Sequence, residues 1–144
     1  LDYVIAAIHQ SFNQSEDEIM KRLEVACKNP YVRHIAHPTG RIIGRRPGYK
    51  PNIEKLMKLA EETNTILEIN ANPKRLDLNA ETVRKYPNVK LTINTDAHHT
   101  NHLEFMKYGV ATAQKGFVAK DRVVNALSRE EFKSLIENNI KLRK

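Results

Sequence analysis

Short apolar runs alternate with amphipathic stretches along the whole chain. Four runs rich in apolar and β-branched residues predict strands, at 3–8, 32–36, 66–70 and 91–95. The first is apolar throughout, which favours a strand buried on both faces, and 110–112 is compatible with a fifth strand. The stretches between the strands repeat apolar positions every three or four residues, as amphipathic helices do. We therefore expect an α/β fold with a parallel sheet.

Polar residues mark where the helices should begin. Ser15 with Glu18, and Ser128 with Glu131, have the form of a capping box, in which each side chain bonds the backbone of the other residue. Single asparagines are expected to cap three further helices: Asn52, Asn79 and Asn101. These caps make the predicted alternation of strands and helices more specific than hydropathy alone.

Composition narrows the possible classes of protein. A chain of 144 residues is long enough for one domain with a hydrophobic core. No apolar run approaches the roughly 20 residues that a membrane helix needs, so we expect no membrane partner. The single cysteine, Cys27, excludes an internal disulfide framework and fits a cytoplasmic protein. It lies on the apolar face of a predicted helix, where we expect a buried thiol.

The charge of the chain is compatible with a polyanionic partner. The formal net charge is +7, and basic domains often bind nucleic acid. Many domains are basic without such a partner, so the clustering of charge is more informative. Four cations lie in the glycine-containing segment 40–50: Arg41, Arg45, Arg46 and Lys50. They could bind phosphate or form an ordinary solvated loop, and the sequence leaves both interpretations open.

Polar side chains follow the carboxyl end of each predicted strand. His9, His37, Asn70 and Asp96 stand there in chain order, and parallel folds place their sites at this edge of the sheet. Asp96 and His98 are two positions apart, so in an extended chain they point the same way. Aspartate and histidine together suit zinc or manganese. On spacing alone, the interpretation of His9 and His37 as ordinary histidines that bond the backbone is slightly favoured.

One face of the predicted strands is polar. By the two-residue period, Glu68 shares a face with Asn70, and Thr92 shares one with Asn94. A polar face inside a sheet is costly unless it lines a site or the mouth of a barrel. A complete (β/α) barrel needs roughly 250 residues, so this chain has too few strands to close one. With a first residue that is not methionine, this favours a piece of a longer protein.

Four segments carry a family resemblance. They resemble motifs of the PHP (polymerase and histidinol phosphatase) domain and comprise Ile8–Phe12, Ala36–Arg41, Leu67–Asn72 and Asn94–His98. Two longer matches, Ala36–Arg46 and Asn70–Asp77, are most like the PHP domain at the C-terminal end of bacterial family X DNA polymerases. The resemblance covers essentially the whole chain. Residues 1–144 are then the C-terminal portion of a single PHP domain, without the N-terminal part of its barrel and without the polymerase domain.

The resemblance implies a fold and an activity. It implies a distorted (β/α)7 barrel with up to three manganese or zinc ions, and a 3′–5′ exonuclease that acts on DNA in repair. By motif, His9 and His37 would share one metal, Asp96 would bind a second and His98 a third. The family's opening His-x-His motif, its next acidic and histidine ligands and its bridging glutamate would all precede Leu1. We therefore expect at most the His9–His37 pair to hold a metal, weakly, and the isolated chain to be inactive.

The resemblance and the residue chemistry also suggest supporting roles. Arg41, Arg45 and Arg75 would contact DNA phosphates next to the metals, because a guanidinium suits bidentate contacts with phosphate. Asn70 and Asn72 would orient the ligands from behind. The remaining histidines are expected not to bind metal: His34, His99 and His102.

Two other functions are compatible with the sequence. One is a phosphomonoesterase like histidinol phosphatase; the basic segment 40–50 favours a polymeric anion over a small one. The other is a non-catalytic PHP module of a polymerase. The potential metal ligands at the strand ends argue against it, because such a module has no chemical reason to keep them. An open parallel edge invites pairing with another strand. The expected protein partners are therefore the remainder of the polymerase chain and, for the isolated chain, a second copy.

Overall fold

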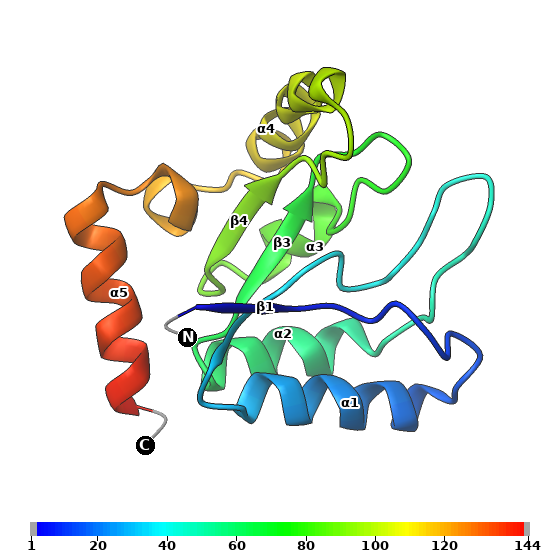
Figure 1. Ribbon diagram of the computed structural model, residues 1–144, viewed down its shortest axis with the longest axis horizontal. Coiled ribbons are helices and arrows are strands. Elements are labelled where there is room, and N and C mark those ends of the chain that lie inside the picture. Colours follow the sequence, from blue (N-terminus) through cyan, green and yellow to red (C-terminus); the bar gives the residue numbers. More distant parts are fainter. Residues whose placement is uncertain (1–2, 143–144) are drawn as a thin grey trace.

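Four parallel strands form the centre of the molecule. The computed structural model describes residues 3–142, with side chains up to residue 138. The strands lie in chain order: β1 (Val4–Ala6), β2 (Val32–Ile35), β3 (Ile66–Asn70) and β4 (Leu91–Asn94). β1 runs at a steep angle to β3 and β4 (Figure 1), so the sheet is strongly twisted. The predicted α/β class and the parallel pairing are confirmed.

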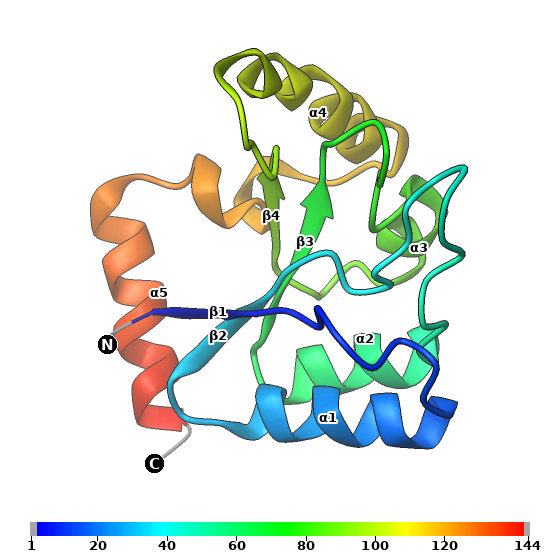
Figure 2. The same ribbon diagram turned by 45° about the vertical axis from the view of Figure 1, so that its right-hand side comes forward.

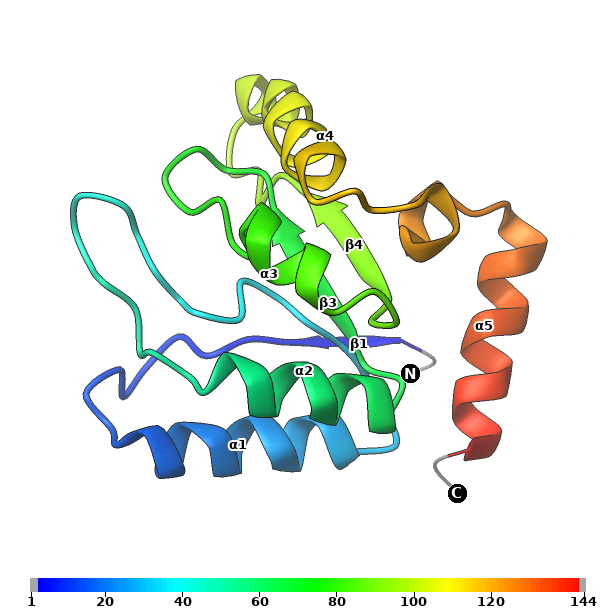
Figure 3. The same ribbon diagram turned by 180° about the vertical axis from the view of Figure 1, so that it is seen from behind.

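The helices follow the strands as the periodicity predicts. They are α1 (Glu16–Lys28), α2 (Ile53–Glu62), α3 (Ala80–Lys85), α4 (Met106–Lys115) and α5 (Arg129–Leu142). Three short 3-10 helices accompany them: η1 (Thr100–Phe105), η2 (Lys120–Arg122) and η3 (Val124–Ala126). Seen from behind, α1 and α2 lie side by side along one side of the sheet, while α4 lies next to the upper ends of β3 and β4 (Figure 3).

Most of the predicted caps are present. Ser15 and Glu18 form the complete capping box of α1, and Ser128 and Glu131 exchange the equivalent bonds at the start of α5. Asn52 and Asn79 cap α2 and α3 through their side-chain oxygens. The expected cap at Asn101 is wrong. There the imidazole of His99 accepts the bond from the Asn101 amide, so the helix begins earlier, at Thr100.

β1 is shorter and more exposed than its apolar sequence predicts. Strand geometry is confined to Val4–Ala6, and Ile5 is 54% exposed. β1 is an edge of the sheet, so no described strand covers its outer side. The prediction of a strand buried on both faces is therefore wrong for the described chain, because a strand needs neighbours and packed faces to be buried.

The predicted fifth strand at 110–112 is also wrong, since these residues lie inside α4. This helix packs closely on β3 and β4 through Gly109. A Cβ at position 109 would lie 2.7 Å from the Cβ of Ala71 and would also collide with Ile93. Ala113, one turn later, is buried on the same side. The short Val-Ala-Thr run gives no local sign of this packing, because β-branched residues also occur in packed helices.

The two faces of the sheet differ sharply. Ile35, Leu67 and Leu91 lie side by side in the register and join a core with the buried side chains of α1 and α2. Cys27 of α1 is buried in this core, as predicted. The neighbouring positions along the strands alternate to the other face, which carries the polar residues. Glu68 there faces Thr92 across the β3–β4 pair.

The outer edge of β4 is covered by a side chain. The Asn125 Oδ1 atom accepts from the Ile93 amide at 3.0 Å, and the Asn125 Nδ2 atom donates to the Ile93 carbonyl at 2.8 Å. Leu91 and Val123 form a parallel bridge beside these bonds. The segment therefore pairs with β4 much as a further strand would. Of the two edge strands, only β1 is then left with an uncovered edge among the described residues, so self-association through an open edge is expected at β1.

A helix lies at one end of the sheet and long loops lie at the other. α5 lies on the side where β1 begins, and the loops that follow β1 and β2 extend on the opposite side (Figure 2). Tyr3 contacts Phe132 of α5, with ring centroids 5.7 Å apart. Within residues 3–142, no helix combines the length and the apolar character that crossing a bilayer requires.

Candidate functional site

The chain turns sharply at two of the expected metal-ligand positions. His37, just after β2, has φ of 31°, and Asp96, just after β4, has φ of 52°. Residues other than glycine seldom adopt this left-handed region of backbone conformation. Residues held there cost free energy and cluster at functional sites. Five other described residues that are not glycine share this geometry, so the positive φ marks a sharp turn at the carboxyl ends of β2 and β4 and does not by itself identify a site.

His9 and His37, which the resemblance implies as ligands of one metal, lie close together. Their ring centroids are 5.1 Å apart and the rings are nearly perpendicular, at 89°. His37 is buried, whereas His9 is exposed. Burial, with the positive charge of Arg75 nearby, lowers the pKa of His37 to about 4. The His37 imidazole is therefore neutral at pH 7, which is the form that binds metals.

The Nδ1 atom of His37 is the best single indication of a ligand. It is buried and has no hydrogen-bond partner among the described residues. Buried polar atoms are normally satisfied, so such an exception calls for an explanation. In the tautomer that carries its proton on Nε2, this nitrogen has a lone pair that no described group uses, and it can bind a cation. The His9–His37 pair therefore fits part of a metal site.

Glu68 fixes the position of His37 from inside the sheet. Its Oε2 atom accepts from the His37 amide at 2.6 Å and from Asn70 Nδ2 at 3.0 Å. Its Oε1 atom accepts from Asn94 Nδ2 at 3.0 Å. Burial raises the pKa of Glu68, and these bonds partly oppose the rise. The sequence had placed Glu68 on the polar face without a role; its period-two pairing with Asn70 was the available signal.

The polar face continues through Thr92 to His34. Asn94 Nδ2 also donates to Thr92 Oγ1 at 3.1 Å, and the same hydroxyl lies 2.9 Å from His34 Nε2. Burial lowers the pKa of His34 to about 4, so this ring too is neutral. His34, Glu68, Asn70, Thr92 and Asn94 are thus joined in one chain of hydrogen bonds, which offsets the cost of placing them inside a sheet.

Asp96 pairs with Arg75 and with its own neighbour. Arg75 Nε donates to Asp96 Oδ2 at 3.0 Å, and both side chains are largely shielded. His98 Nδ1 lies 2.7 Å from the Asp96 carbonyl and 3.9 Å from its Oδ1 atom. The His98 side chain is 77% exposed. Arg75, expected to contact phosphate, is thus placed against a carboxylate.

The four expected metal ligands therefore meet two by two. His9 lies against His37, and Asp96 lies against His98. Over the described part of the chain, no three histidine, cysteine, aspartate or glutamate side chains converge to hold an ion. The described residues thus supply pairs of donors and not a complete trinuclear set.

Arg41 and Asn72 shape the loop after β3. The Arg41 guanidinium donates from Nε to the Arg75 carbonyl at 2.6 Å and from Nη2 to the Leu76 carbonyl. Asn72 Oδ1 accepts from the Lys74 amide at 3.0 Å, and the Asn72 amide donates to Asn70 Oδ1 at 3.0 Å. These bonds organise backbone, and phosphate contacts by Arg41 stay a prediction.

The basic segment is anchored by one buried carboxyl group. Asp77 Oδ2 accepts from the Thr39 amide at 2.8 Å and from the Thr39 hydroxyl at 2.9 Å. Burial raises the pKa of Asp77. Arg45 lies further out in the same segment and is exposed. Of the three expected phosphate-contacting arginines, Arg45 is the one whose side chain is most open to solvent.

The last two histidines take part in the local cap at η1. His99 Nδ1 accepts from the Asn101 amide at 3.3 Å, and His102 Nδ1 accepts from the His98 amide at 3.2 Å. Both rings thus use Nδ1 for the backbone, which agrees with the expected position near a helix start.

Sequence comparisons relate the chain to larger enzymes. No protein-family model matches it. It is 52% identical over 141 residues to the DNA polymerase/3'-5' exonuclease PolX of Bacillus subtilis (strain 168), covering 96% of this chain and 25% of that protein. It is 28% identical over 136 residues to a probable phosphatase of Thermoanaerobacter sp. (strain X514), covering 87% of this chain and 53% of that protein.

A shorter likeness points the same way. A probable phosphatase of Caldanaerobacter subterraneus subsp. tengcongensis is 41% identical over 73 residues, which cover 49% of this chain and 26% of that protein. The chain thus spans about a quarter to a half of the curated relatives it matches. It is a homologue of PolX, and the resemblance that the motifs indicate is confirmed.

Proposed function

We propose that this chain is part of a metal-dependent phosphoesterase domain, the 3′–5′ exonuclease of a bacterial family X DNA polymerase that acts in DNA repair. The observation that carries the proposal is the His9–His37 pair, with a buried, neutral His37 whose Nδ1 atom has no partner among the described residues. The 52% identity to a protein named as a 3'-5' exonuclease supports the choice of reaction.

The donor types suit manganese or zinc. His9 and His37 would hold one ion, and Asp96 and His98 would contribute to two others in the complete domain. Bound divalent ions neutralise phosphate charge and lower the pKa of a coordinated water toward neutrality. Because His37 is already neutral at pH 7, it can bind an ion there without first releasing a proton.

The other residues position these groups and the DNA. Glu68 accepts a hydrogen bond from the His37 amide, so the backbone that carries the ring cannot shift without breaking a buried bond. Arg45 is exposed and free to contact a phosphate, whereas Arg75 would reach one from its place beside Asp96. Arg41, Asn70 and Asn72 keep the loop that carries Arg75 in shape.

The fold supports a larger domain around this site. The polar strand face fits the interior of a (β/α)7 barrel, where ligands from several strands converge. We infer that the missing ligands and strands come from the remainder of the polymerase chain, which would pair with β1. The isolated chain, with only donor pairs among its described residues, is then inactive.

A second candidate is a phosphomonoesterase. The observation in its favour is the likeness to probable phosphatases, one of which this chain matches over 53% of that protein's length. The cluster of cations in 40–50 favours a polymeric substrate instead. The two candidates use the same ions and differ in the size of the anion that the loops admit.

Digestion of single-stranded DNA with manganese tests the proposal. The 5′-labelled DNA is incubated with this chain, with a longer chain that restores the upstream part of the barrel, and with the His37→Ala variant of the longer chain. Stepwise shortening by the longer chain alone, lost in the variant, is the expected result. Phosphate release from a small phosphomonoester without shortening of DNA would move the assignment to the phosphatase. Silence on both substrates would refute catalysis.

A further inference from the structure

Three planar groups from two loops are stacked beside the candidate site. The rings of Phe12 and Tyr49 are nearly parallel, at 7°, with centroids 6.0 Å apart. The guanidinium carbon of Arg46 lies 3.9 Å from the centroid of the Phe12 ring. Phe12 and Arg46 are half-buried and Tyr49 is buried. The stack therefore has a buried base and an outer part that solvent reaches.

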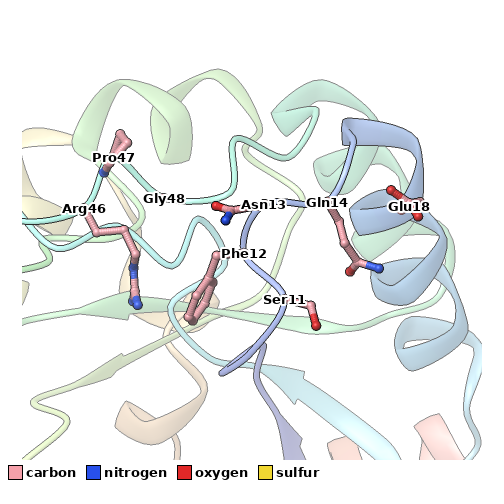
Figure 4. A pocket seen from close by; sticks show the side chains of 8 residues that line it. All are labelled: Ser11, Phe12, Asn13, Gln14, Glu18, Arg46, Pro47 and Gly48. Atoms are coloured by element: carbon pink, nitrogen blue, oxygen red, sulfur yellow. The ribbon is translucent and has the colours of Figure 1, made fainter.

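A pocket of about 660 Å³ opens next to the outer part of the stack. Its volume lies within the roughly 300–1,000 Å³ of small-molecule sites. Phe12 and Arg46 line it together with two side-chain amides, from Asn13 and Gln14 (Figure 4). The pocket thus combines flat surfaces with polar groups that both donate and accept hydrogen bonds.

The charge of the pocket is uneven. Arg46 lies on one side and Glu18 on the other (Figure 4). The Glu18 carboxylate accepts bonds from the Ser15 amide and hydroxyl, and these bonds lower its pKa, so it is negative at pH 7. A phosphate is repelled from that side and attracted to Arg46. A ligand with one anionic end and one uncharged planar end fits this asymmetry.

The stack is joined directly to the candidate metal pair. The Tyr49 hydroxyl donates to the His37 carbonyl at 3.4 Å, and Arg46 Nε donates to the Gly40 carbonyl at 3.0 Å in the same segment. A purely structural role, in which the stack ties two loops together, would account for Tyr49. It does not account for a guanidinium and a phenyl ring left half-open at a polar pocket.

We propose that this pocket binds one nucleotide of single-stranded DNA, with its base stacked on the outer face of the Arg46 guanidinium, which Phe12 supports from behind, and its phosphate on the Arg46 side. Nucleobases stack on aromatic rings and on guanidinium planes, whatever their sequence. The inference rests on the proposed function for its substrate, DNA, and adds where a base is held, in a pocket whose stack is bonded to the His37 carbonyl. Neither Phe12 nor Arg46 was expected from the sequence to contact a base.

Fluorescence anisotropy with two probes tests this placement. The probes are a 5′-labelled oligothymidine and an abasic oligonucleotide of equal length, which keeps the phosphates but has no bases. The proteins are this chain, Arg46→Lys and Phe12→Leu, measured without divalent metal. Arg84→Lys is the matched control, because the Arg84 guanidinium lies 4.7 Å over Phe117 elsewhere on the surface. Thermal unfolding of each variant checks that it is folded.

The two probes separate the contribution of the bases to binding from that of the phosphates. Arg46→Lys and Phe12→Leu should each weaken oligothymidine binding about tenfold, the scale of one base stack. Binding of the abasic probe should change by less than about twofold, because lysine keeps the charge. If Phe12→Leu does not fold, Arg46→Lys alone decides.

Three results would overturn the inference: wild-type chain that binds both probes equally, equal losses on both probes, or an equal loss in Arg84→Lys. Its failure is distinct from that of the exonuclease proposal. Manganese-dependent digestion with base-independent binding would refute only the stacking site. Base-dependent binding by this chain, with no digestion of DNA by the longer chain, would refute only the exonuclease.

Discussion

Replacing Glu68 by glutamine should destabilise the fold, although the two side chains have the same shape. The carboxylate accepts three bonds, from the His37 amide, Asn70 and Asn94. Glutamine offers one acceptor oxygen. If that oxygen keeps the two bonds at the Oε2 position, its NH2 group faces Nδ2 of Asn94, and two donors then meet in a buried place.

The magnitude follows from this conflict. A buried donor without an acceptor costs about 1–3 kcal/mol. Burial raises the pKa of Glu68, so replacing this carboxyl by a neutral amide also removes a cost of burial and would increase the free energy of unfolding. Hydrogen bonds to an ionised group are stronger than bonds to a neutral one, however, and their loss outweighs this gain. We expect Glu68→Gln to lower the free energy of unfolding by about 2 kcal/mol.

Urea unfolding at pH 7 measures the effect, with Glu61→Gln as the matched control. Glu61 is exposed and also accepts from an asparagine, Asn88 Nδ2, at 2.7 Å. At the surface water replaces the lost bond, so the control should change stability by less than about 0.5 kcal/mol. Equal stabilities for Glu68→Gln and the wild type would refute the role of Glu68 as the centre of the buried network.

Three further substitutions test other parts of the structure. Gly109→Ala should lower the free energy of unfolding, measured with urea, by about 1–2 kcal/mol. The collision of the added methyl group with Ile93 and Ala71 outweighs the higher helix propensity of alanine. A more stable variant would contradict the close packing. Asp77 has a raised pKa in the folded state, so stability should fall as pH rises from its unfolded pKa through its folded pKa. Asp77→Asn should reduce this fall in unfolding curves measured across pH, leaving the part due to Glu68, and an unchanged slope would contradict it. Asn125→Ala should cost about 1–2 kcal/mol in thermal unfolding through two lost edge bonds, and no change would contradict the edge-covering role.

Local patterns predicted most of the parts of the fold that local chemistry decides, with the exception of the cap at Asn101, where His99 takes that role. The caps at Ser15, Asn52 and Asn79 depend on bonds within one turn, and β3 has the predicted bounds 66–70. The errors at β1 and at 110–112 depend on distant partners. Whether an apolar run is covered, or which helix packs on which strand, is a property of the assembled sheet.

The candidate site also has features that the local sequence predicts and features that depend on distant parts of the chain. Strand ends are local, so the sequence could place His37 and Asp96 at one edge of the sheet. The loop after β3 is not local to either residue, so nothing near Asp96 indicated that Arg75 would pair with it. The Phe12–Arg46 contact likewise joins two loops whose approach depends on the whole fold.

Zinc titration followed by NMR of the histidine side chains tests the central claim most directly, since it observes each ring of this chain separately. His9 and His37 should shift first and together, at weak affinity, and His37→Ala should abolish the shift of His9. His34, bonded to Thr92, should not move. Shifts confined to His98, His99 and His102, with His37 unmoved, would contradict the account.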